Sequence, residues 1–183
     1  GSNRMNIYTV GAATQGLSNY LKVAFKDLPE IKVVVGHDVR KNSRKFAEIV
    51  ADIFSANGIK VYLFDSCRPT PEMSFAIRHF GCQSGVIITA SHNPKEYNGY
   101  KAYGPDGCQM TDDAAAVVYA EIQKTDILTG AEMMSFEDGI AKGLIEYVGE
   151  DCKEALYSAI EACAVRPGIC KTAGTKRVDS PLH

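Results

Sequence analysis

Three short apolar runs, separated by stretches with helical spacing, constrain the fold of this chain more than any other feature. The runs are Ile31–Val35, Lys60–Phe64 and Gly85–Thr89, and β-branched residues dominate the first. Alternating strands and helices favour an α/β domain, because parallel strands need long crossover connections and helices usually supply them. We therefore predict an α/β fold with the three runs as buried strands.

Helical segments lie between these strands and after them. Ser43 can act as the N-cap of the second helix, Pro71 suits the first turn of the third, and Gly81 can end it. Tyr100–Tyr103 and Cys108–Met110 flank the turn residues of a hairpin-like connection. We expect helices over 9–25, 43–57, 70–80, 111–124 and 151–164, a short helical turn within 125–139, and further strands within 140–148 and 176–179.

Composition argues against several classes of partner. Lys and Arg number 20 against 22 Asp and Glu, and the formal net charge of -2 does not suit a nucleic-acid surface. No apolar run reaches the ~20 residues of a membrane helix, and no signal peptide is apparent. Six cysteines without Cys-x-x-Cys spacing are typical of reduced thiols. We expect a cytoplasmic protein with neither a nucleic-acid nor a membrane partner.

The third apolar run leads directly into a cluster of reactive side chains. Its continuation is Thr89-Ala90-Ser91-His92-Asn93-Pro94, which places a hydroxyl, an imidazole and an amide on one tight loop. Lys101 follows shortly after. Because ligands bind at the carboxyl ends of strands in open α/β sheets, we expect Ser91 to face such a crevice.

The chemistry of this loop leaves two interpretations open. A phosphorylated Ser91 would add about -1.5 to -2 charge, which His92, Asn93 and Lys101 could stabilise as donors or as a cation. The alternative is an ordinary polar turn without a chemical role. A serine hydrolase is disfavoured, since no Gly-x-Ser-x-Gly elbow is present and adjacent residues rarely form a triad.

A family resemblance favours the first interpretation. The loop, with Asn98-Gly99-Tyr100-Lys101 and Gly104-x-Asp106-Gly107, resembles the phosphoserine loop of the α-D-phosphohexomutases, above all the bacterial phosphoglucomutase/phosphomannomutase group. Supporting segments in the same order are Thr9–Leu17, Gly36-His37-Asp38-x-Arg40-x-x-Ser43 and Thr70-Pro71. The resemblance spans about residues 3–165. It implies a three-layer α/β/α domain with a mixed sheet.

The resemblance also implies residue roles. In the family, a phosphoserine interconverts hexose 1-phosphates and 6-phosphates through a hexose bisphosphate. Carried over, Ser91 is the phosphoryl carrier and, through its phosphate, a metal ligand. His92 and Lys101 are catalytic acid/base or charge-stabilising groups, and Asn93 and Arg40 belong to the substrate-binding side. The implied cofactors are Mg²⁺ and hexose 1,6-bisphosphate as activator, and the implied partners are hexose phosphates.

Other motifs of the family are absent from these 183 residues. They are the metal loop Asp-Gly-Asp-x-Asp-Arg, the sugar-selecting loop Gly-Glu-x-Ser-Gly and the phosphate-clamping loop Arg-x-Ser-Gly-Thr. We expect a first-domain fragment, with domain I at 1–149 and a connecting helix with the start of domain II at 150–183. By itself the fragment is expected to be inactive and to self-associate through surface that truncation exposes. The rival hypothesis is a non-catalytic domain that binds phosphate weakly at the Ser91 loop.

Overall fold

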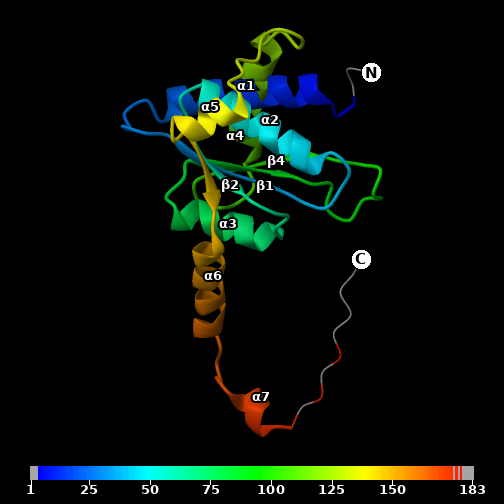
Figure 1. The fold of residues 1–183 in the computed structure, drawn as a ribbon, viewed down its shortest axis with the longest axis vertical. Coiled ribbons are helices and arrows are strands. Elements are labelled where there is room, and N and C mark those ends of the chain that lie inside the picture. The colour runs from blue at the N-terminus through cyan, green and yellow to red at the C-terminus, as the bar shows by residue number, and fades with distance from the viewer. Residues whose placement is uncertain (1–3, 175, 177, 179–183) are drawn as a thin grey trace.

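The computed structural model describes residues 4–174, 176 and 178, and a five-stranded sheet lies at its centre (Figure 1). The strand order is β4-β3-β1-β2-β5. Neighbouring strands are parallel except for β4, which pairs antiparallel with β3, so the sheet is mixed. The strands are β1 (Lys32–His37), β2 (Lys60–Phe64), β3 (Ser84–Ile88), β4 (Tyr100–Tyr103) and β5 (Ile145–Val148).

Helices cover both faces of the sheet, which completes the expected three layers (Figure 1). Three helices, α1, α2 and α4, contribute to the apolar cluster on one face, and α5 packs against α2 there. On the opposite face α3 packs with the first turn of α6. The helices are α1 (Ile7–Ala24), α2 (Ser43–Ala56), α3 (Thr70–His79), α4 (Asp112–Lys124), α5 (Phe136–Ala141), α6 (Glu150–Ala162) and α7 (Ile169–Thr172).

The inner strands are apolar on both faces because both faces are covered. In β1, Val33 and Val35 join the cluster beneath α1 and α2, whereas Val34 between them joins the cluster with α3. All three are fully buried. Alternate side chains of β1 thus pack into the two apolar clusters on opposite faces of the sheet. A strand that is buried on both faces favours β-branched residues, and the run at this position supplies them.

Close packing of α1 against α4 depends on Gly16. A Cβ at this position would overlap a side-chain carbon of Ile122 and lie 2.7 Å from the backbone nitrogen of the same residue. Only glycine, which has no side chain, allows α1 and α4 to pack this closely. Gly11, one and a half turns earlier in α1, has no such constraint, since its nearest neighbour would be the Ala131 methyl at 3.4 Å.

The structure corrects three expectations about elements. Residue Asn42, with φ 65°, is the N-cap of α2, whereas Ser43 is the first helical residue and its hydroxyl bonds elsewhere. Ile140 belongs to α5, so only residues 145–148 of the segment 140–148 form a strand. The short helix α7 had no expected counterpart. The strand expected at 176–179 includes residues outside the described part of the chain.

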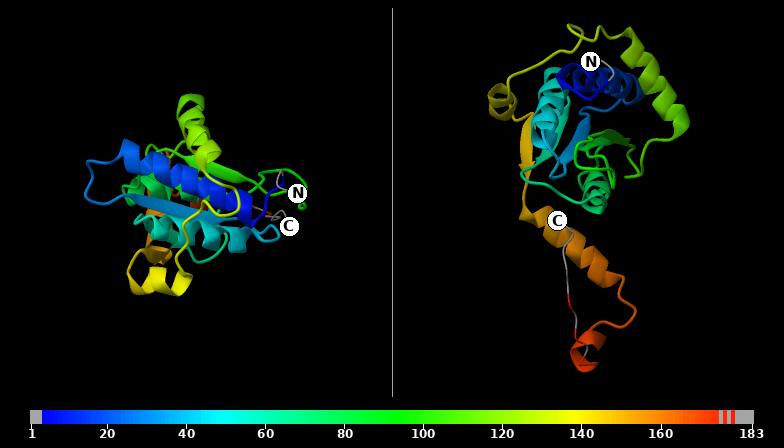
Figure 2. Two further views of the ribbon diagram at one scale, coloured as in Figure 1. Left: turned by 90° about the horizontal axis from the view of Figure 1, so that it is seen from above. Right: turned by 90° about the vertical axis from the view of Figure 1, so that its right-hand side faces the viewer.

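The connecting helix α6 leaves the layered body after its first turn (Figure 2). Cys152 in that turn is fully buried against α3, whereas Tyr157 and Ile160 further along are more than half exposed. Arg68, before α3, forms ion pairs with Glu72 of α3 and Glu150 of α6. The start of α6 is therefore anchored to the body, and the boundary at 149/150 stays a prediction. Within the described residues, no helix has the length and apolarity needed to cross a bilayer.

Candidate active site at the carboxyl edge of the sheet

Ser91 lies at the carboxyl edge of the sheet in a backbone conformation that few residues adopt. It follows β3 by three residues, its side chain is exposed, and its φ of 57° falls in the left-handed region. This conformation costs a residue with a side chain roughly 1–2 kcal/mol. Such strain persists only where the surroundings hold it, and it gathers at functional sites. The conformation of Ser91 therefore depends on the contacts of its loop.

Asp38 is the centre of these contacts. It follows β1 as Thr89 follows β3, and because the two strands are parallel neighbours, both residues reach the same edge. The Oδ1 atom of Asp38 accepts hydrogen bonds from the Arg40 backbone N–H and the Ser43 hydroxyl, each at 2.9 Å. The Oδ2 atom accepts from Thr89 Oγ1 at 2.6 Å and from Arg40 Nε at 2.9 Å.

These bonds change the acidity of the Asp38 carboxyl. Burial by itself raises its pKa, because the charged form loses water. Hydrogen bonds from Thr89, the Arg40 backbone and Ser43, together with the charge of Arg40, act in the opposite direction and outweigh burial. The net result is a pKa below the ordinary value for an aspartate. Asp38 therefore stays charged and keeps its four donors.

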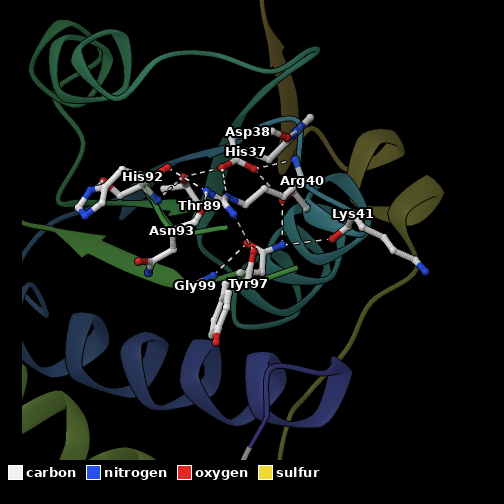
Figure 3. Close-up of polar contacts among 12 residues, drawn as sticks. His37, Asp38, Arg40, Lys41, Thr89, His92, Asn93, Tyr97 and Gly99 are labelled. Atoms are coloured by element: carbon white, nitrogen blue, oxygen red, sulfur yellow. Dashed lines mark hydrogen bonds and ion pairs between the residues drawn. The ribbon is translucent and has the colours of Figure 1, made fainter. Parts of the chain in front are cut away.

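Arg40 binds the Ser91 loop with its whole guanidinium (Figure 3). Nη2 donates to the carbonyl oxygens of Ser91 at 2.9 Å and Asn93 at 2.7 Å. Nη1 donates to those of Pro94 at 2.6 Å and Tyr97 at 3.1 Å. With the bond from Nε to Asp38, all five N–H groups of the side chain are used, and the side chain is only 9% exposed.

The far end of the loop is fixed by Asn98 and Gly99. The Asn98 amide donates to Ser43 Oγ at 2.8 Å, and its Oδ1 accepts from the Gly99 backbone N–H at 2.9 Å. The carbonyl of Gly99 then accepts from the Thr89 N–H at 3.0 Å, which closes the loop. A Cβ at Gly99 would lie 2.7 Å from the Thr89 carbonyl oxygen, so only glycine fits here.

The structure brings some of the predicted site residues together but not all of them. His92 lies beside Ser91, with 3.3 Å between its Nδ1 and the serine Oγ. Asn93 contributes its backbone to the loop, since its N–H donates to the Ala90 carbonyl and its own carbonyl binds Arg40. Lys101 lies in β4 opposite Ile87, and among the described contacts no hydrogen bond or ion pair joins it to Ser91 or His92.

Three residues of the site were missed by sequence reasoning as functional candidates: Asp38, Thr89 and Asn98. Asp38 and Thr89 are 51 positions apart in the sequence, and their contact depends on the pairing of β1 with β3. A usable signal was present nonetheless, since Thr89 ends one predicted strand and Asp38 follows another by three residues, and polar residues at the carboxyl ends of parallel strands meet at one edge of a sheet.

Among the described residues no group of three or more His, Cys, Asp or Glu side chains could hold a metal ion. A cavity of about 310 Å³ adjoins the loop where the start of α1 meets β4, lined in part by Thr9, Asn98 and Tyr100. A larger cavity of about 530 Å³ lies between the starts of α1 and α2 and touches none of the Ser91 loop. All six cysteines are free.

The three-layer fold and its serine loop together define the class, the α/β/α domain that carries a serine at the carboxyl edge of a mixed sheet. Residues 1–128 match the family model for phosphoglucomutase/phosphomannomutase, alpha/beta/alpha domain I. The chain belongs to this family.

Individual relatives agree with the family match. A phosphoglucomutase of Staphylococcus haemolyticus is 39% identical over 159 residues, which are 87% of this chain and 28% of the relative. One from Staphylococcus epidermidis is 44% identical over 124 residues, 68% of this chain and 22% of the relative. The chain thus spans about a quarter of the length of these curated relatives.

Solved structures share the fold. A provisionally named phosphomannomutase from Thermus thermophilus superposes with a TM-score of 0.72 at 26% identity, covering 88% of this chain and 33% of that one. A Paramecium phosphoglucomutase, parafusin, in its open form gives a TM-score of 0.57 at 26% identity over 69% of this chain and 23% of that chain.

Proposed function

We propose that this chain is the serine-carrying domain of a phosphohexomutase, which interconverts hexose 1-phosphates and 6-phosphates through a phosphoserine and a hexose bisphosphate. The observation that carries the proposal is the exposed Ser91, held in a left-handed turn at the carboxyl edge of the sheet in a member of this family. Its substrate partners are then hexose phosphates, and its setting is the cytoplasm.

In the proposed reaction the Ser91 Oγ carries a phosphoryl group. A sugar hydroxyl attacks the phosphorus and gives its proton to a base, the bond from phosphorus to Oγ breaks, and the released serine oxygen takes up a proton. His92 is placed to give the proton to the serine oxygen, because its Nδ1 is 3.3 Å from Oγ. Lys101 is assigned to charge stabilisation on the strength of the family resemblance, and Asn93 to shaping the loop.

Mg²⁺ is the metal that the proposed reaction needs, because a divalent cation neutralises charge that develops on the transferred phosphoryl group. In this chain the one ligand we assign is the phosphate on Ser91. The Asp38 carboxylate does not suit the ion, since both of its oxygens already accept two hydrogen bonds. Hexose 1,6-bisphosphate is the proposed donor that phosphorylates the serine.

We infer that these 183 residues accept a phosphoryl group slowly and catalyse little turnover alone. Among the described residues no group of three or more His, Cys, Asp or Glu side chains could hold a metal ion, and the phosphate-clamping segment Arg-x-Ser-Gly-Thr does not occur in the sequence. Self-association through the exposed face of α6 is a further part of this proposal, since Tyr157 and Ile160 lie there unburied.

The proposal is tested by intact-mass spectrometry after incubation with glucose 1,6-bisphosphate and Mg²⁺. We expect the chain to gain one phosphate over time, and Ser91→Ala to gain none. A Ser74→Ala variant, altered at a serine in α3, serves as the matched control and should be labelled like the unchanged chain. Absence of any label contradicts the proposal and favours a domain that only binds phosphate. Rapid mutase turnover by the chain would contradict its inferred inactivity.

A further inference from the structure

We propose that Arg40, together with Asp38 and Thr89, is a positioning residue that holds Ser91 in its left-handed conformation for phosphoryl transfer. The inference rests on the proposed function and deepens it, because it assigns Arg40 to the geometry of the phosphoryl carrier instead of to the sugar phosphate. It begins from the strained backbone of Ser91, with φ 57° at an exposed serine.

Both backbone polar groups of Ser91 are held by this network. Its N–H donates to Thr89 Oγ1 at 3.1 Å, and the same hydroxyl donates to Asp38. Its carbonyl accepts from Arg40 Nη2 at 2.9 Å, and the Nε of that guanidinium is bound to the same aspartate oxygen. The two bonds that flank the Ser91 dihedral angles therefore converge on one carboxylate, which fixes the conformation from both sides.

The guanidinium is saturated by these contacts, which separates positioning from substrate binding. Four of its N–H groups bind carbonyl oxygens of the loop and the fifth binds Asp38. A substrate phosphate could gain a bond from Arg40 only if the loop lost one. Figure 3 shows Arg40 enclosed between Asp38 and the loop, whereas the His92 side chain points away from it.

The bonds from Arg40 to the loop carbonyls also reduce the repulsion that a negatively charged group at the loop would meet. Carbonyl oxygens carry partial negative charge, and a phosphoryl group beside them would be repelled. Arg40 gathers the carbonyls of Ser91, Asn93, Pro94 and Tyr97 around its own positive charge. The negative ends of four peptide dipoles thus face a cation inside the loop instead of the phosphate outside it.

Lysine cannot replace Arg40 in this role. An ammonium group donates from a single nitrogen, whereas the planar guanidinium spreads five donors over three nitrogens. The four carbonyls and Asp38 are bound through all three of those nitrogens. We therefore expect Arg40→Lys to resemble Arg40→Met, although it keeps the charge.

The first arm of the test is hydrogen–deuterium exchange on the 183-residue chain carrying Arg40→Lys, Arg40→Met or Thr89→Val. Thr89→Val removes the bridging hydroxyl with little change in volume, and it keeps the test informative if an Arg40 variant folds poorly. Arg44→Met alters an exposed arginine of α2 and is the control. We expect the amides of residues 89–99 to lose protection about tenfold or more in all three variants, with β2 unchanged.

The second arm measures Ser91 phosphorylation by glucose 1,6-bisphosphate against donor concentration. Positioning predicts a lower rate at saturation in Arg40→Lys with a nearly unchanged half-saturating concentration, since the donor does not contact Arg40. A raised half-saturating concentration with an unchanged maximal rate would overturn the inference in favour of substrate binding. Unaltered exchange of residues 89–99 would overturn it as well. If the unchanged chain is never phosphorylated, the proposed function fails, and the exchange arm alone decides whether Arg40 holds the loop.

Discussion

Single residues at the carboxyl edge of the sheet decide how Ser91 is presented. Asp38 and Thr89 come from two neighbouring parallel strands, and Arg40 joins them to the loop. None of these residues is a nucleophile or a base in the proposed chemistry. These residues matter because several hydrogen bonds converge on the partly buried carboxylate of Asp38. The charge of Asp38 is therefore the property that a substitution should change.

Asp38→Asn should destabilise the fold by about 1–3 kcal/mol at neutral pH, because an amide can accept at only one of the two positions where the carboxylate binds two donors each. Urea denaturation measures the change, with the exposed Asp113→Asn as control. The pKa of Asp38 is lowered in the fold, so its stabilising effect is present above the unfolded pKa and is lost as pH falls through the folded pKa. The difference between the two proteins should therefore shrink below about pH 4, and a difference that grew there would contradict this account.

Asp52 in α2 is predicted to behave in the opposite way. Burial, followed by the nearby charges of Glu48 and Glu137, raises its pKa to about 6, and its Oδ1 is buried without a hydrogen-bond partner. The folded state then holds a proton that the unfolded state releases, so stability falls as pH rises from about 4 to about 6. Asp52→Asn should raise stability at pH 7.5 by on the order of 1 kcal/mol, after allowance for solvent screening, and gain little at pH 4. Equal effects at both pH values would refute the assignment.

At the scale of elements, the approach of α1 to α4 is set by a glycine instead of by complementary large side chains. Gly16 lies against the backbone of Ile122, whereas Gly11 in the same helix has ordinary space around it. The pair allows one kind of substitution to be compared at two positions of one helix.

Gly16→Ala should destabilise the protein by roughly 1–3 kcal/mol, because α4 must move to admit the methyl group. Gly11→Ala is the matched control and should be neutral or stabilising by up to about 1 kcal/mol, since alanine favours a helix interior more than glycine does. Thermal denaturation followed by circular dichroism compares the two. Equal effects would mean that the contact between Gly16 and Ile122 does not limit the packing of the helices.

Elements with a strong local pattern could be predicted, and those set by distant contacts could not. The three inner strands follow from apolar runs, because burial on both faces demands them. In contrast, Ile140 reads as part of a strand but lies in α5, which packs against α2. The contact between Ser91 and His92 is local in sequence, whereas the bonds from Arg40 to the loop join residues more than 50 positions apart.

At the scale of the whole molecule, the fold presents the exposed Ser91 loop on a three-layer body and leaves most of α6 outside that body (Figure 2). The chain spans about a quarter of its curated relatives. Our central proposal is that Ser91 of this domain carries a phosphoryl group.

The most direct test of that claim is to locate the phosphate after the chain has been treated with glucose 1,6-bisphosphate and Mg²⁺. Trypsin releases the loop in the peptide of residues 79–95, which holds Ser84, Thr89, Ser91 and His92. Tandem mass spectrometry in acid distinguishes a stable phosphoserine from a labile phosphohistidine. We predict that the phosphate is on Ser91. Phosphate on His92, on Ser84 or Thr89, or only outside this peptide would contradict it.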